Sequence, residues 1–151
     1  MTFIRKLNLF HLFPFLFAAY PIFALSSSNL IYVQYSSFIR ALIVVEFATL
    51  LVYAFCGLIS RDIGKGGLLA TAILLVFFSY GQLYQVLNAH FPEMFRPRYL
   101  ILLMAIILLA VIFLVVRAKS PSKMLLQYLT ITGGILLAIS AYPTMRNGIV
   151  N

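Results

Sequence analysis

Polar side chains recur at helical spacing within one long apolar run of this chain. Ser79, Gln82 and Gln85 are three residues apart, and Tyr80 and Tyr84 lie at neighbouring angles. We call Ser79, Tyr80, Gln82 and Gln85 the polar stripe. Their hydroxyl and amide groups can donate and accept hydrogen bonds. An unpartnered amide is costly in an apolar medium, so we expect the stripe to face other polar groups.

Glu46 is the one carboxylate well inside an apolar run. A charge at membrane depth costs at least about 2.5–3.5 kcal/mol, so this group must be paired, protonated or turned toward other helices. It lies eight residues into a run at 38–59, about 12 Å deep at 1.5 Å per residue. Counting back along the next, antiparallel run predicts the same depth for Ser79, Tyr80 and Gln82.

Two interpretations of these residues remain open. In the first, Glu46, Tyr80, Gln82 and Gln85 line a polar cavity for a head group or a substrate. In the second, these residues and Ser79 form a cluster of interhelical hydrogen bonds, worth about 0.6 kcal/mol per bond. The second is favoured, because hydrogen bonds between helices are the ordinary use of polar groups in membrane proteins.

Other reactive groups are isolated in the sequence. Arg40 is six residues from Glu46, so the two do not face each other on one helix, and we expect Arg40 to reach lipid head groups. His11 has no second histidine or cysteine at ligand spacing. Cys56 is the single cysteine, which excludes an internal disulfide and a multi-cysteine metal site. We therefore predict no metal and no cofactor.

Sequence motifs of the common enzyme classes are absent. There is no phosphate-binding loop, dinucleotide fingerprint or His-Glu-x-x-His, and no Gly-x-Ser-x-Gly elbow. Only three acidic residues occur, which makes paired-carboxylate catalysis implausible. The sequence thus predicts a protein that is not an enzyme.

Composition sets the fold class. Of the 151 residues, 64% are hydrophobic and 9% are charged, against about 25% charged in soluble domains. The net charge of +8 comes from the polar spacers, so we do not expect nucleic acid as a partner. A helix needs about 20 apolar residues to cross a bilayer. The sequence predicts a single all-α integral membrane domain, 1–151, whose five transmembrane helices lie roughly at 7–25, 38–59, 68–87, 99–116 and 124–142.

The positive charges predict the orientation. With the amino terminus inside, seven basic residues lie inside and four outside, which accounts for the 11 in the chain. The inside residues are Arg5, Lys6, Arg61, Lys65, Arg117, Lys119 and Lys123. The outside residues are Arg40, Arg96, Arg98 and Arg146. The positive-inside rule favours this arrangement, with the carboxyl terminus outside. A cleaved signal peptide ending near Ala24-Leu25-Ser26 is the alternative for the first run, although that run is long for one.

A resemblance to a known family is carried by five segments: 13–23, Arg40-Ala41-Leu42, Lys65-Gly66-Gly67-Leu68-Leu69, 77–84 and Arg98-Tyr99-Leu100. They resemble the membrane region of bacterial membrane-anchored sulfatase-like proteins of the alkaline phosphatase superfamily. Segment 77–84 looks like the element FFSYGHVY of that family, with Gln82 where the family has histidine. Strong matches cover about 30 residues, although weaker similarity extends over nearly the whole chain.

The resemblance implies a layout like that of lipoteichoic-acid synthases, with five spans ahead of an external catalytic domain. The metal-binding carboxylates and histidines of that domain have no counterpart in these 151 residues. Its nucleophile in a Cys/Ser-x-Pro-x-Arg setting is also missing, because Cys56 is followed by Gly57 and Leu58. The resemblance therefore implies an anchor region and carries over no activity.

Taken together, the sequence predicts a non-catalytic, multi-pass module of a bacterial cytoplasmic membrane. Its expected partners are membrane lipids and other membrane protein subunits, or it is a stand-alone anchor region related to the sulfatase-like proteins. The alternative is a small carrier or lipid-binding protein with a polar pocket near Glu46 and Gln82. Glu46→Gln separates the two, because it should abolish transport or lipid binding in a carrier but alter only assembly or stability in a subunit.

Overall fold

The computed structural model describes residues 11–28, 35–90 and 97–148. Within these ranges the chain forms helices and no strand. The helices are α1 (Phe13–Ser28), α2 (Tyr35–Ser60), α3 (Ile63–His90), α4 (Pro97–Arg117) and α5 (Lys123–Gly148). The last four are long and apolar enough to cross a membrane, whereas α1 is a shorter apolar helix of 16 residues. The predicted all-helical, multi-pass class is confirmed at this level.

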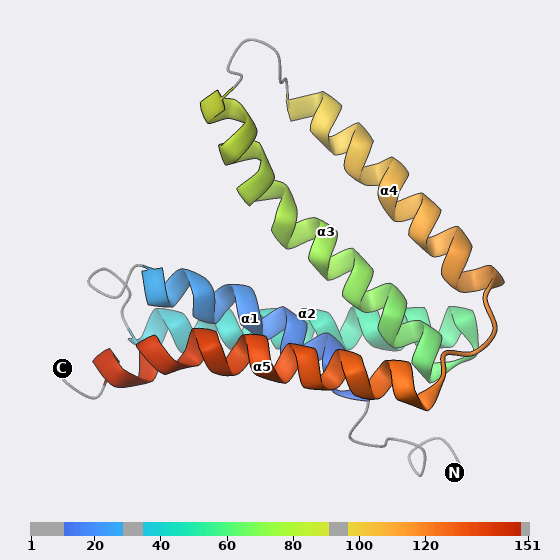
Figure 1. Ribbon diagram of the computed structural model, residues 1–151, viewed down its shortest axis with the longest axis horizontal. Coiled ribbons are helices and arrows are strands. Elements are labelled where there is room, and N and C mark those ends of the chain that lie inside the picture. The colour runs from blue at the N-terminus through green and yellow to red at the C-terminus, as the bar shows by residue number, and fades with distance from the viewer. Residues whose placement is uncertain (1–10, 29–34, 91–96, 149–151) are drawn as a thin grey trace.

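Three helices lie side by side, and the other two leave them as a hairpin (Figure 1). Helix α1 packs against both α2 and α5, so these three form one layer. Helix α3 starts in contact with α1 and α2 and then leaves the layer obliquely, with α4 returning alongside it. The main neighbour of α4 is α3. The far side of the hairpin is therefore uncovered by the described part of the chain.

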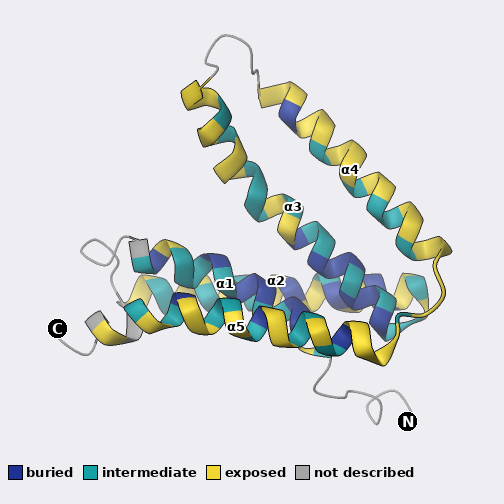
Figure 2. Ribbon diagram, in the orientation of Figure 1, coloured by how far each residue is buried: buried dark blue, intermediate teal, exposed yellow. Residues whose placement is uncertain are grey.

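The core lies where α1 meets α5 and the first turns of α3. Phe13, Phe17 and Leu126 form a buried cluster there. The partly buried residues packed against it are Leu68, Leu129 and Leu136. Figure 2 shows burial concentrated at this junction and α4 exposed along most of its length. In hydrocarbon, helices associate through van der Waals packing rather than through removal of apolar surface from water. Helix α1 contacts α2, α3 and α5, so it stabilises the bundle as its central packing element.

Glycines let helix backbones approach at these contacts. A Cβ atom built on Gly66 of α3 would lie 2.6 Å from the Cα of Gly57 in α2. A Cβ on Gly67 would lie 2.7 Å from the Cζ of Phe13 in α1. On α5, a Cβ on Gly133 would lie 3.0 Å from the nearest side-chain carbon of α1. Small residues at close crossings are typical of membrane helix packing, and here they join α3 and α5 to the α1–α2 pair.

Helix α3 begins earlier than the sequence pattern predicts. The pattern predicts a connection over 60–67 and a span over 68–87, but the helix starts at Ile63 and includes Gly64, Gly66 and Gly67 as buried residues. The turn is confined to Arg61 and the residue after it, and Arg61 takes a left-handed conformation with φ of 52°. The glycines therefore serve helix packing rather than chain reversal.

The other helix boundaries differ less from those predicted from the sequence. Helices α2 and α4 extend a few residues beyond the predicted 38–59 and 99–116. Helix α5 continues past the predicted end at residue 142, through Pro143. The first span is predicted over 7–25, and its residues 7–10 lie outside the described residues. The helix there begins at Phe13 and runs on to Ser28, so His11 precedes it.

Some hydroxyl groups within the helices bond to their own backbone, whereas the buried hydroxyls of Tyr53 and Thr71 have no hydrogen-bond partner among the described residues. Thr49 Oγ1 donates to the carbonyl of Val45 at 2.8 Å, and Thr130 Oγ1 donates to the carbonyl of Leu126 at 2.9 Å. Such bonds satisfy a hydroxyl without a partner helix. The hydrogen bond of Thr49 therefore lies within its own helix and does not join α2 to a neighbouring helix.

Candidate functional site

Glu46 lies half-buried on α2, at helical spacing from Thr49 and Tyr53, which are both buried. In the polar stripe on α3, Ser79 and Tyr80 are half-buried, and both glutamines are exposed. The rings of Tyr80 and Tyr84 stack with centroids 6.3 Å apart and planes 13° apart. The stripe thus lies on the carboxyl-terminal half of α3.

The structure does not join Glu46 to the polar stripe. Helices α2 and α3 cross at Gly57 and Gly66 and then diverge, so the carboxyl-terminal half of α3 leaves the layer that contains α2 (Figure 1). Glu46 and the stripe would share one depth only if the two helices stayed alongside each other. Among the described side chains, no hydrogen bond or ion pair connects Glu46 with the stripe. A shared pocket around Glu46 and Gln82 stays a prediction, as does lipid contact by Arg40, which is exposed on α2.

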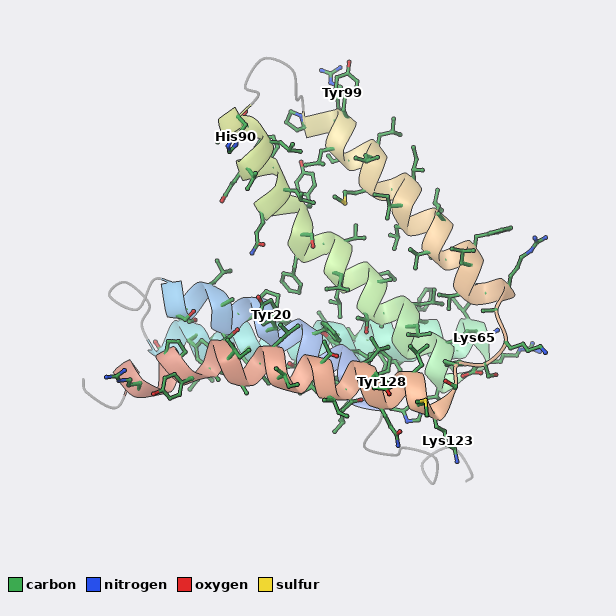
Figure 3. The ribbon with its side chains drawn as sticks, viewed as in Figure 1. Tyr20, Lys65, His90, Tyr99, Lys123 and Tyr128 are labelled. Carbon is green, nitrogen blue, oxygen red and sulfur yellow. The ribbon has the colours of Figure 1, made fainter. Side chains whose placement is uncertain are left out.

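Basic residues gather at the opposite end of the bundle, where the α2–α3 turn meets the α4–α5 connection. Figure 3 shows Lys65 and Lys123 there, whereas His90 and Tyr99 lie at the far tip of the hairpin. We call this region the basic end. Its members are Arg61, Lys65, Arg117, Lys119 and Lys123. The sequence predicts these residues on one side of the membrane, but it does not predict that two of them, Lys65 and Lys119, line a cavity.

The cavity at the basic end has a volume of about 220 Å³. Lys65 and Lys119 line it, and its other walls are apolar, with Leu68, Leu114 and Leu125 among them. Lys65 Nζ donates to the carbonyl oxygen of Val116 at 3.2 Å, so its ammonium group is held at the last turn of α4. A cation is favourable at that position, because the carboxyl end of a helix carries partial negative charge.

Two further contacts shape the basic end. The guanidinium carbon of Arg117 lies 4.6 Å from the centroid of the Phe113 ring, a cation–π contact. The carboxylate of Asp62 accepts hydrogen bonds from the backbone amides of Gly64 and Lys65, at 2.8 and 3.2 Å. Asp62 is therefore the amino-terminal cap of α3. The hydroxyl of Ser120 also bonds to this carboxylate, which ties the two connections together.

The pKa of Asp62 lies below its ordinary value. Burial raises the pKa, but the hydrogen bonds from Ser120, Lys65 and Gly64, together with the charge of Lys65, lower it by more. These contacts favour the charged form. The carboxylate is thus ionised and committed to the helix cap.

Asp62→Ala should lower the free energy of unfolding by about 1 kcal/mol at neutral pH, as expected for a lost amino-terminal cap. Because the pKa is lower in the folded state, the carboxylate stabilises the fold above its unfolded pKa. That stability is lost as pH falls through the folded pKa. Unfolding in detergent, followed from neutral to acid pH, should show the two proteins converging. Asp62→Asn keeps an acceptor and is the control. A difference that is constant with pH would contradict this role.

A second cavity, of about 650 Å³, lies between α2, α3 and α4. Its walls are apolar and include Phe55, Cys56, Leu69 and Ile112. It can hold hydrocarbon, but it presents no group that would orient a polar ligand. In the described ranges no three histidine, cysteine or acidic side chains come together as a metal site. We call the cavity at the basic end, lined by Lys65 and Lys119, the basic cavity. Of the two cavities it is the one that can bind an anion, and it does so next to an apolar surface.

Comparison with known proteins gives no relative for this chain. No family model matches it, and no curated protein or solved structure is similar to it. The resemblance to the membrane region of sulfatase-like proteins therefore stays a prediction.

Proposed function

We propose that this protein is a non-catalytic, multi-pass membrane module that acts as a small subunit of a larger membrane assembly. One observation carries the proposal. The polar stripe ends in two exposed glutamines, Gln82 and Gln85, on a helix that is otherwise long and apolar enough to span a bilayer. Another membrane protein would supply the hydrogen-bond partners that lipid chains lack.

The depth of these amides follows from the length of α3. The helix has 28 residues, about 42 Å at 1.5 Å per residue, against a hydrocarbon thickness of about 30 Å. With Lys65 at one boundary, Gln82 lies about 26 Å along the helix and therefore still inside the hydrocarbon. Gln85 lies near the opposite boundary. An amide at the depth of Gln82 is costly unless a partner satisfies it.

Helix α4 adds apolar surface to the hairpin that carries the amides. Large apolar side chains are exposed along it, including Leu102, Leu109 and Phe113. Apolar surface alone is equally satisfied by lipid, so it gives no selectivity. The glutamines supply that selectivity, and α4 supplies packing area on the same hairpin.

The orientation belongs to the same proposal. The basic end faces the cytoplasm, in keeping with the positive-inside rule, and the outer half of α3 then lies toward the outside. In a bacterial cytoplasmic membrane this places the amino terminus inside and the carboxyl terminus outside. A module similar to the anchor of sulfatase-like proteins would have the same orientation.

Purification in a gentle detergent followed by native mass analysis tests the proposal. The native chain should carry a stoichiometric membrane-protein companion. The double variant Gln82→Leu/Gln85→Leu should retain about tenfold less of it, because two interhelical hydrogen bonds of about 0.6–1.7 kcal/mol each are removed. Gln127→Leu, the same change on α5, is the matched control. A native chain isolated only as a monomer or homo-oligomer with retained lipid would contradict the subunit role and favour the carrier alternative.

A further inference from the structure

The basic cavity has the form of a site for an amphiphile. Lys65 comes from α3 and Lys119 from the α4–α5 connection, so two separate segments each bring a positive charge to it. Leu68, Leu114 and Leu125 give it apolar walls from α3, α4 and α5. A ligand that fits both parts must carry a negative group and a hydrocarbon chain a few bonds apart.

The charges around the cavity favour an anion. Of the acidic residues within the described ranges, Asp62 is the one at the basic end, and its carboxylate is occupied by the start of α3 and by Ser120. The carbonyl of Val116, at the end of α4, would repel an anion, but Lys65 donates to it. An ammonium group has three donors, so Lys65 retains two after this bond.

The volume limits how much of a ligand enters. About 220 Å³ is less than the roughly 300–1,000 Å³ of pockets that enclose a whole small molecule. The cavity therefore accommodates a phosphate, the adjoining glycerol ester and the start of one chain, while the remaining hydrocarbon stays in the bilayer. Basic pockets between membrane helices are known to bind anionic lipid head groups in this way.

We propose that the cavity lined by Lys65 and Lys119 binds one anionic phospholipid, with its phosphate between the two lysines and the start of an acyl chain against Leu68, Leu114 and Leu125. This site lies at the opposite end of α3 from the glutamines of the proposed subunit contact. Lipid binding at this site therefore requires no partner protein, and it is independent of whether that contact exists.

The test uses the full chain in nanodiscs of phosphatidylcholine with a minority of phosphatidylglycerol. Native mass spectrometry then counts the lipids that each released chain retains. The native chain should retain one phosphatidylglycerol in preference to phosphatidylcholine. Lys65→Gln and Lys119→Gln should each reduce that preference roughly fivefold, and the double variant should abolish it, since a lysine near a membrane surface contributes about 1 kcal/mol. Both leaflets have the same composition, so orientation does not affect the result.

Two controls separate the site from general charge and from free phosphate. Lys123→Gln removes one positive charge from the basic end, but Lys123 does not line the cavity. The preference of this variant for phosphatidylglycerol should therefore match that of the native chain. Leu125→Trp fills the apolar part and should abolish retention of the lipid. Equal losses in Lys123→Gln and Lys119→Gln would overturn the proposal, as would retention by the double variant. Displacement of the lipid from the native chain by millimolar inorganic phosphate would also overturn the proposal, because the acyl contact would then contribute nothing to the affinity.

Discussion

Gly66→Ala is expected to lower the free energy of unfolding by about 2–3 kcal/mol, at the upper end of the range for overpacked cores. The added Cβ would lie 2.6 Å from the Cα of Gly57 and 2.7 Å from its nitrogen. Both are backbone atoms, so no side chain can rotate out of the way. Helices α2 and α3 must move apart, and the dispersion contacts along their crossing weaken together.

Gly57→Ala is the matched control, because it adds the same carbon on the other side of the same crossing. A Cβ on Gly57 meets nothing within 4 Å. Its expected effect is within about 0.5 kcal/mol, offset or reversed by the higher helix propensity of alanine. Reversible unfolding in mixed micelles, followed by fluorescence, measures both variants. Equal effects of the two substitutions would contradict an approach of α2 and α3 through Gly66.

The helices themselves were predictable from the sequence, because long apolar runs between polar spacers have few alternatives to a membrane helix. The runs at 38–59 and 99–116 match α2 and α4 within a few residues. Hydropathy is summed over many residues, so one misassigned side chain changes little. The same summation explains why the helical class is confirmed while the exact ends differ.

The packing of α3 was not predictable from local pattern. Gly64, Gly66 and Gly67 follow a polar turn, and clustered glycine is as typical of a reversal as of a close helix crossing. Only the position of Gly57 on the neighbouring helix distinguishes the two uses. That position is set by the tertiary structure. The divergence of α2 and α3 beyond their crossing, which separates Glu46 from the polar stripe, is set by the tertiary structure too.

The basic cavity shows the same limit. Charge counting places Lys65 and Lys119 on one side of the membrane, because that argument needs only the order of spans and loops. The cavity arises from contact between segments distant in sequence, as in the bond from Lys65 to Val116, 51 residues away. No pattern of spacing within one segment contains this contact. The sequence could therefore predict the charge of this end but not its shape.

Phe13→Ala is expected to cost about 3 kcal/mol of unfolding free energy, the lower end of the usual range for removing a buried phenylalanine. Phe13 is 0% exposed and forms the core with Phe17 and Leu126. In a membrane the hydrocarbon offsets part of the transfer term, so the loss is mainly that of packing contacts. Leu12→Ala, next to it and 40% exposed, is the control and should change stability by less than about 1 kcal/mol.

The partner of Phe13 gives a sharper form of this prediction. A Cβ on Gly67 would lie 2.7 Å from the Cζ of Phe13, so Gly67→Ala alone should destabilise the fold. Phe13→Leu removes the atom in conflict, and the added methyl then fills part of the space it leaves. The double variant Phe13→Leu/Gly67→Ala should therefore be more stable than the sum of the single effects by about 1 kcal/mol or more, as expected for residues in contact. Strict additivity in a double-mutant cycle would mean that α1 and α3 do not meet through this pair, and that the core of the bundle is arranged differently.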